Sequence, residues 1–297
     1  MRYSVVRASA SFGSLSGRAR PALPLAPTRC ETPSRGTRPP SLGRLRNAVW
    51  GYWKKYGRHD LPWRKTKDPY KILVSEVMLQ QTQVSRVEGK YREFLESFPT
   101  LRALAKTPLQ GVLKVWSGLG YNRRAKFLHD SAKEIMRKYN GKFPTFYSEL
   151  IELPGIGDYT AKAVRVFAFN QPEVLIETNI RTVFFHHFSK IWTRRVHISD
   201  KEVGELARKA AESQNPREWH WALMDYGAHL KSSGVRINAR SKHYTKQSKF
   251  EGSLRQVRGA ILRAITQNKS VKEIKKLHKD NYEQAFASLV HDGLLMR

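Results

Sequence analysis

The sequence predicts an all-α fold. From about Leu42 onwards, apolar residues recur at three- and four-residue intervals, strand-like alternation is scarce, and Gly and Pro fall mainly between the periodic segments. Asp68-Pro69 has the pattern of a helix N-cap followed by proline at the first helical position. We therefore expect many short helices joined by short loops. They cover 70–80, 83–97, 109–117, 122–139, 146–152, 158–169, 178–188, 199–213 and 218–230.

Composition divides the chain into four segments. Residues 1–40 contain seven Arg, no Lys and one acidic residue, Glu31, which predicts a disordered basic tail. This Arg- and Ser-rich composition resembles an organelle transit peptide, and a flexible DNA-binding arm is the other interpretation. Residues 41–230 form the predicted main domain, and 231–252 a basic loop. Residues 253–297 form a helical extension, either packed on the main domain or built as a small winged-helix-like module; Ser253 caps its first helix, and further helices fit 270–277 and 280–290.

The charge of the chain indicates a polyanionic partner. Lys and Arg total 54 against 25 Asp and Glu, which gives a formal net charge of +29. No apolar run approaches the length that spans a bilayer, so we expect no membrane contact. A ribosomal or chromatin-associated basic protein also fits this charge. The single cysteine, Cys30, excludes a disulfide within the chain and a cysteine-based metal site.

A short turn between two predicted helices has the composition of a phosphate-binding site. Leu153, Pro154, Gly155 and Gly157 belong to the segment LPGIG, which directly precedes the helix 158–169. Glycine lets the backbone approach a ligand closely, and the N–H groups at a helix N-terminus bind phosphate. Such a turn holds a DNA phosphate without reading sequence, although an ordinary interhelical turn has the same pattern.

Four sequence blocks in order resemble the MutY-type adenine DNA glycosylases of the helix-hairpin-helix superfamily. The blocks are LPWR (61–64), SEVMLQQTQV (75–84), GLGY (118–121) and LPGIG (153–157). The resemblance implies a fold of two α-helical lobes and an enzyme that flips its target nucleotide out of the DNA stack. It implies that Gln80 or Gln81 wedges into the vacated space. It also places Tyr121 at the DNA and Arg64 either near the flipped base or on a backbone phosphate.

The resemblance also implies the catalytic residues. Glu76 matches the acid that protonates the departing adenine, and burial is expected to raise its pKa. Glu177 stands where the family has Asp facing the sugar, with Asn179 positioning it; the extra methylene of Glu moves the carboxylate by roughly one bond length. Tyr159 stands where endonuclease III-like relatives have the lysine that forms a Schiff base, so we expect no lyase activity.

Two features of the family are missing from this sequence. The four cysteines that bind a [4Fe–4S] cluster after Gly227 are absent, with Lys231 at the position of the first, so no such cofactor is expected. The 45 residues after Gly252 are too few for the C-terminal domain that recognises 8-oxoguanine. A monovalent cation at the hairpin is compatible with the sequence. The basic loop is expected to contact DNA through Arg240, Lys242, Lys246 and Lys249.

We therefore predict a monomeric, monofunctional DNA glycosylase that acts on adenine opposite G or 8-oxoguanine in double-stranded DNA. A glycosylase for T or U opposite G and a non-catalytic lesion-binding protein are the alternatives. The family suggests a bacterial cytoplasmic enzyme of the nucleoid, and organelle targeting by residues 1–40 stays open.

Overall fold

The computed structural model describes residues 41–192, 197–242 and 249–295, and these residues fold almost entirely into helices. They form no β-strand, and only an isolated bridge joins Ile198 to Ser241. All of them belong to one compact unit, Pro39–Arg297. None of their helices is both long enough and apolar enough to cross a bilayer. The all-α prediction is confirmed, whereas the predicted tail 1–40 and Lys246 lie outside the described residues.

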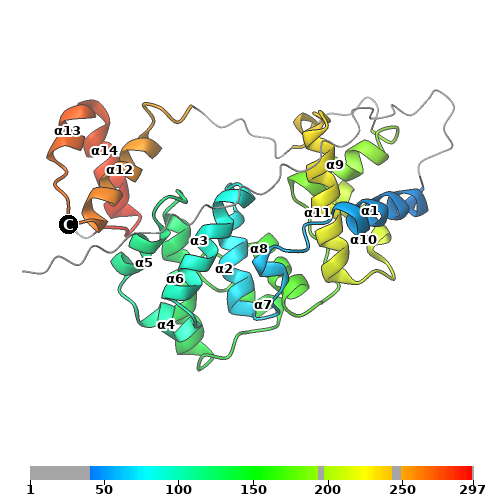
Figure 1. Ribbon diagram of the computed structural model, residues 1–297, viewed down its shortest axis with the longest axis horizontal. Helices are drawn as coiled ribbons and strands as arrows, with labels where there is room; N and C mark the ends of the chain where they lie inside the picture. The colour runs from blue at the N-terminus through cyan, green and yellow to red at the C-terminus, as the bar shows by residue number, and fades with distance from the viewer. Residues whose placement is uncertain (1–40, 193–196, 243–248, 296–297) are drawn as a thin grey trace, which may run out of the picture. The chain divides into compact units, whose positions relative to one another are not determined.

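Helix α2 (Pro69–Leu79) is the centre of one group of helices (Figure 1). It begins as predicted, because the Asp68 carboxylate accepts hydrogen bonds from the backbone N–H groups of Tyr70 and Lys71. Every residue from 72 to 78 is buried, and the helix packs on α3, α6 and α8. Glu76 therefore lies within a buried stretch of the helix. The group also contains α3 (Val84–Ser97), α4 (Leu101–Lys106), α5 (Leu109–Trp116), α6 (Arg123–Lys138), α7 (Tyr147–Ile151) and α8 (Asp158–Phe167).

Helix α11 (Pro216–Ser232) is the centre of a second group. It packs on α9 (Thr178–His187) and α1 (Leu42–Tyr56), and α10 (Asp200–Ala211) packs on both of these. Helix α11 also contacts α8, which joins the two groups. The N-terminal ends of α8 and α9 each carry one of the predicted catalytic residues.

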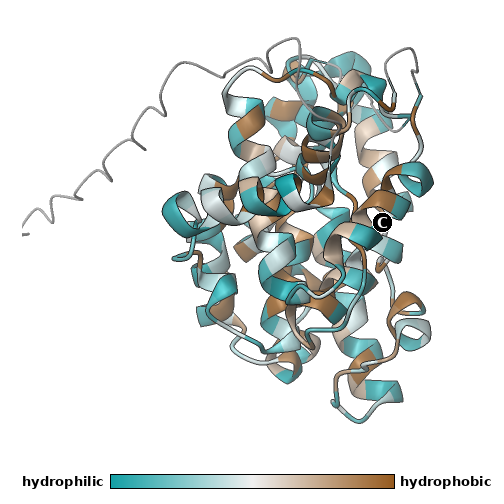
Figure 2. Cartoon of the chain, turned by 90° about the vertical axis from the view of Figure 1, so that its right-hand side faces the viewer, coloured by the Kyte–Doolittle hydropathy of each residue, from teal (hydrophilic) through white to brown (hydrophobic). Residues whose placement is uncertain are grey.

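The C-terminal extension consists of α12 (Leu254–Thr266), α13 (Lys272–Leu277) and α14 (Lys279–His291). Helix α12 packs on α14 and on α5 of the first group. Ser253 is the N-cap residue of α12, as predicted, but its hydroxyl makes no cap hydrogen bond and donates to the Phe250 carbonyl oxygen. Figure 2 shows apolar and polar residues on the same helices, as expected for helices that bury one face.

Candidate active site

Glu76 is a buried carboxyl group in the middle of α2, with 9% of its surface exposed. Burial raises its pKa to about 8, with a further increase from the charge of Glu177, whereas Arg64 acts in the opposite direction. Because this pKa lies above neutrality, Glu76 is mostly protonated at pH 7. A protonated carboxyl group is what a general acid needs.

Glu177 is the N-cap of α9. Its two carboxylate oxygens accept hydrogen bonds from the backbone N–H groups of Asn179, at 2.9 Å, and Ile180, at 3.0 Å. Burial raises the pKa of Glu177 above its ordinary value, and these hydrogen bonds and the charges of Lys231 and Arg181 oppose part of that rise. Glu177 therefore has more support for a negative charge than Glu76, so the two carboxyl groups are suited to different roles.

Tyr159 lies in the first turn of α8, and its pKa is raised well above 10. Burial is the main cause, and the charges of Glu76 and Glu177 add to it. The three predicted catalytic side chains therefore influence one another electrostatically, although they come from three different helices. The phenol stays neutral over the whole physiological range and carries no amine that could form a Schiff base.

Lys231 belongs to the same neighbourhood, which the sequence patterns do not reveal. Its ammonium group donates a hydrogen bond of 3.3 Å to the side-chain oxygen of Asn179, and its charge lowers the pKa of Glu177. The end of α11 does not fit an iron–sulfur cluster, because such clusters need thiolate ligands and this segment has none. No group of three or more His, Cys, Asp or Glu in the described ranges is arranged to hold a metal ion.

Gly227 allows α11 to lie directly against the first turn of α9. A Cβ atom at this position would come within 2.1 Å of the Asn179 carbonyl oxygen, so any side chain would push α9 away. We expect Gly227→Ala to destabilise the protein by about 3 kcal/mol, because overpacking here moves backbone atoms. The melting temperature should fall by about 6–12 °C. Differential scanning calorimetry measures this change.

The matched control is Gly204→Ala in α10, where an added Cβ meets no atom within 4 Å. Alanine favours a helix over glycine by up to about 1 kcal/mol, so this variant should be as stable as the wild type or more so. A Gly227→Ala variant with an unchanged melting temperature would contradict the close approach of α11 to α9.

Arg64 is buried rather than open to solvent; its side chain is 4% exposed. Its guanidinium group donates two hydrogen bonds to Asp225, at 2.8 and 2.9 Å, and lies between the rings of Trp53 and Trp221. Burial would raise the pKa of Asp225, but Arg64 and Arg58 outweigh it and hold the pKa below its usual value. Arg64 therefore supplies fixed positive charge near Glu76, and its contact with DNA stays a prediction.

The predicted hairpin turn joins α7 to α8. Leu153 is buried, Pro154 is half-buried, and Gly155 and Gly157 are exposed at the N-terminus of α8. Gly155 has φ +72°, and a Cβ there would meet Phe127 at 2.4 Å, so this position requires glycine. The Ser131 hydroxyl fixes the turn by donating to the Pro154 carbonyl oxygen at 2.7 Å.

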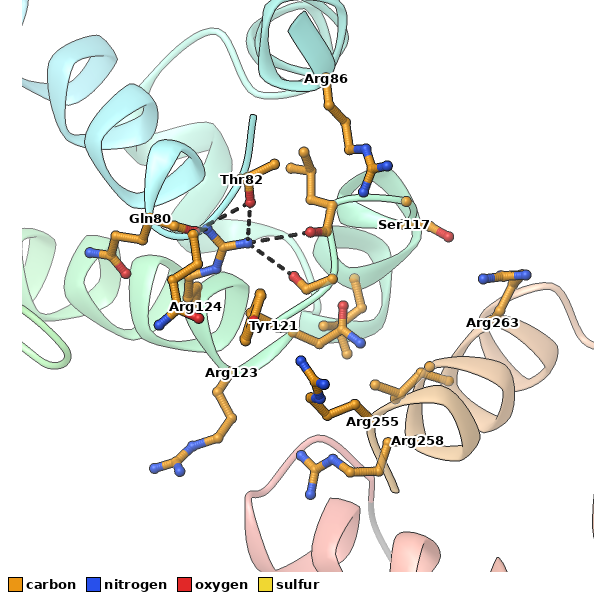
Figure 3. Close-up of a pocket in the computed structure, with 18 of the residues that line it drawn as sticks. Gln80, Thr82, Arg86, Ser117, Tyr121, Arg123, Arg124, Arg255, Arg258 and Arg263 are labelled. Carbon is orange, nitrogen blue, oxygen red and sulfur yellow. Dashed lines mark hydrogen bonds between the residues drawn. The ribbon is translucent and has the colours of Figure 1, made fainter. Parts of the chain in front are cut away.

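Arg124 organises the loops that carry Gln80, Gln81 and Tyr121 (Figure 3). Its buried guanidinium group donates hydrogen bonds to the carbonyl oxygens of Val77, Met78 and Gln80 at the end of α2, where helix carbonyls lack partners. It also donates to the Thr82 hydroxyl and to the carbonyl oxygens of Leu119 and Gly120.

Gln81 and Tyr121, on the loops that Arg124 holds, have backbone conformations in the left-handed region. Gln81 has φ +53° and Tyr121 has φ +48°, and both side chains are exposed. Gln80 is half-buried and its amide donates to the Thr160 hydroxyl at 3.3 Å. The structure therefore brings Gln80 beside the hairpin helix and leaves Gln81 at the surface.

Residues 233–242 of the basic loop follow α11 at the end of the second helical group, whereas 249–252 lie directly before α12. Arg240 is half-buried at the end of a short 3-10 helix, Asn238–Arg240, and Lys242 and Lys249 are exposed. That Arg240, Lys242 and Lys249 contact DNA stays a prediction.

Comparison with known proteins decides the family. Residues 74–212 match the family model described as the HhH-GPD superfamily base excision DNA repair protein. A thymine/uracil-DNA glycosylase of Pyrobaculum aerophilum is 33% identical over 187 residues, which cover 62% of this chain and 81% of that protein. The chain belongs to the HhH-GPD superfamily.

Other known proteins resemble the chain over a similar length. An adenine DNA glycosylase of Buchnera aphidicola subsp. Baizongia pistaciae is 39% identical over 184 residues, or 61% of this chain. The match covers 51% of that relative, so the chain spans about half of its length. The solved structure of a thermostable thymine-DNA glycosylase superposes with a TM-score of 0.55 and 28% identity, covering 63% of this chain and 86% of the other.

Proposed function

We propose that the chain is a monofunctional DNA glycosylase that removes a mispaired adenine, opposite G or 8-oxoguanine, from double-stranded DNA. The observation that carries this proposal is the pair of buried carboxyl groups, Glu76 and Glu177, which lie close enough for the charge of Glu177 to raise the pKa of Glu76 and which differ in the groups around them. Glu76, with a pKa of about 8, is suited to donate a proton. Glu177 is the better candidate for the anion, because backbone hydrogen bonds and two neighbouring cations oppose the rise that burial causes in its pKa. The proposed reaction uses no iron–sulfur cluster.

In the proposed reaction, Glu76 donates its proton to a ring nitrogen of the flipped adenine. The bond between the sugar C1′ and the base nitrogen breaks, and its electron pair leaves with the base, which departs as a neutral molecule. The Glu177 carboxylate stabilises the positive charge that develops on the sugar. Water then adds to C1′ and returns one proton to the carboxyl pair, so the enzyme is regenerated and the DNA backbone stays intact.

A thymine- or uracil-removing enzyme is the second candidate. It is favoured by the Pyrobaculum aerophilum relative, of which the chain covers 81%, and by the similarity to the thermostable thymine-DNA glycosylase structure. Glu76 supports adenine instead, because a protonated acid at the base assists a purine leaving group. The two candidates share the fold and the carboxyl pair, so the substrate base must be measured.

A single-turnover assay on labelled duplexes with A:8-oxoG, A:G, T:G and U:G pairs separates these candidates. We expect release of adenine and strand breaks only after hot alkali, since Tyr159 cannot form a Schiff base. Faster release from T:G or U:G would support the second candidate. Breaks without alkali would contradict the monofunctional mechanism, and tight binding with no base release would support a non-catalytic lesion-binding protein.

A further inference from the structure

A groove of about 870 Å³ lies between the first helical group and α12 of the C-terminal extension (Figure 3). One wall consists of residues 80–83, Arg86 and the loop 117–124. The other wall is the face of α12 that carries Gly259, together with Phe250 before it. The groove thus includes Gln80 and Gln81, and its lining reaches Phe127, which lies against Gly155 of the hairpin.

The charged lining of the groove has a single sign. It contains no Asp, Glu or Lys and six arginines, which are Arg86, Arg123, Arg124, Arg255, Arg258 and Arg263. Arginine presents a planar fork of donors that matches the oxygens of a phosphate. A strip of guanidinium groups contributed by the three helices α3, α6 and α12 therefore predicts a ligand with several phosphates.

The arginines of the strip do not all have the same role. Arg124 holds backbone carbonyls, and Arg258 donates to Ser288 and Asp292. Arg86 and Arg263 are exposed on opposite walls, and within the described ranges neither forms an ion pair. These two side chains are available to a ligand without breaking an existing contact.

The groove also offers surfaces for bases and for a close backbone approach. Tyr121 is 37% exposed and Phe250 is 62% exposed, and aromatic rings at such positions stack on unpaired bases. A Cβ added at Gly259 would meet no atom within 4 Å, so the middle of α12 presents an open, flat face. Arginines that alternate with aromatic rings are typical of proteins that follow a nucleic-acid strand.

The two walls are joined by specific contacts rather than by the linker alone. The Asp292 carboxylate accepts a hydrogen bond from Arg258 of α12 and lies 3.6 Å from the Arg123 guanidinium of α6. Gly293, with φ +65°, lies so close to the Lys126 side chain that a Cβ would be 2.9 Å from it. The extension is therefore docked in a way that keeps the groove open.

We propose that this groove binds the sugar–phosphate backbone of a DNA strand next to Gln80 and Gln81, so that α12 is part of the DNA-binding surface. The inference rests on the proposed function, which supplies DNA as the partner, and it assigns to the C-terminal extension a role in binding. Charge complementarity carries it, because a groove whose lining contains six arginines and no acidic residue fits a polyanion.

The test compares two double variants that remove equal charge. Arg86→Gln/Arg263→Gln removes one exposed arginine from each wall. Arg102→Gln/Arg208→Gln removes two exposed arginines that do not line the groove. Fluorescence anisotropy measures the affinity for an A:8-oxoG duplex from about 50 to 200 mM salt, where each phosphate contact contributes about 0.9 to the logarithmic slope.

We expect the groove variant to bind about tenfold more weakly at the lower salt and its slope to become shallower by about 2. The control variant should keep the wild-type slope. Equal changes in both variants would mean that only net charge matters and would overturn the inference. A change that Arg86→Gln alone reproduces, with none from Arg263→Gln, would remove α12 from the surface.

Failure of the inference is distinguishable from failure of the proposed function. Base release at saturating protein, measured in single turnover on the wild type, reports on the carboxyl pair, whereas the salt slope of binding reports on the groove. Base release in the wild type with identical slopes in both double variants would overturn the groove alone. A shallower slope in the groove variant would support the groove even in a protein that releases no base.

Discussion

Glu76→Gln is expected to reduce the single-turnover rate of base release by about 10³- to 10⁴-fold and to leave DNA affinity within about threefold of the wild type. General acid catalysis accounts for an effect of this size. Glutamine has nearly the shape of a protonated glutamic acid but cannot transfer a proton to the base. The rate is measured at saturating protein, so that a change in affinity does not contribute to it.

The pH dependence gives an independent check on Glu76. Its pKa of about 8 means that the acid is progressively lost above that pH. We expect the logarithm of the rate to fall with a slope of −1 above about pH 8. A rate that is constant up to pH 10 would mean that another group supplies the proton.

The same raised pKa has a consequence for stability. The folded protein retains the Glu76 proton up to about pH 8, whereas the unfolded chain releases it near the ordinary value of 4.5. Between these values the folded state binds more protons, so the free energy of unfolding decreases as the pH rises. The E76Q variant has no proton to lose at this position, so its free energy of unfolding does not show this decrease with pH. At pH 8 we expect its melting temperature to be on the order of 5 °C higher than that of the wild type.

Glu96→Gln is the matched control, since this glutamate is exposed on α3. It should change neither the rate nor the melting temperature. An E76Q variant that melts below the wild type at pH 8 would contradict the buried, proton-retaining carboxyl group.

Sequence patterns predict those parts of the protein that depend on local chemistry. Examples are the Asp68-Pro69 start of α2 and the three- to four-residue spacing of apolar residues, because a helix cap or an amphipathic face depends only on residues of one short segment. Helix α4 is missed, since six residues are too few to show a period. Motif resemblance identifies Glu76, Glu177 and Tyr159 individually, but only the fold shows that their charges act on one another.

Contacts between distant segments leave no local pattern. Asp225 lies 161 positions from Arg64, and Lys231 lies 52 positions from Asn179, so neither partner is apparent before the helices are packed. From sequence alone, the arginines of α12 cannot be distinguished from those of any solvated helix, because only the fold shows that α12 packs on α5. Charge alone therefore predicts a polyanionic partner and not the surface that receives it.

Glu177→Gln is expected to reduce base release by about 10²- to 10³-fold, because the sugar loses the negative charge that stabilises its transition state. The variant should still fold, since the glutamine oxygen accepts one of the two N-cap hydrogen bonds that Asn179 and Ile180 donate. Loss of the other hydrogen bond costs about 1 kcal/mol. Circular dichroism and single-turnover rates separate these effects on stability and on activity.

Glu177→Asp tests whether the site is built for the longer side chain. Aspartate is a good N-cap, so stability should be maintained. Its carboxylate ends roughly one bond length short of the glutamate position, and we expect a rate about 10- to 100-fold lower. A faster E177D variant would mean that glutamate is the poorer residue at this position.

Lys231→Met tests the charge next to Glu177. Without this charge the pKa of Glu177 rises, so the acid side of the pH–rate profile should move to higher pH. The maximum rate should change less than in E177Q.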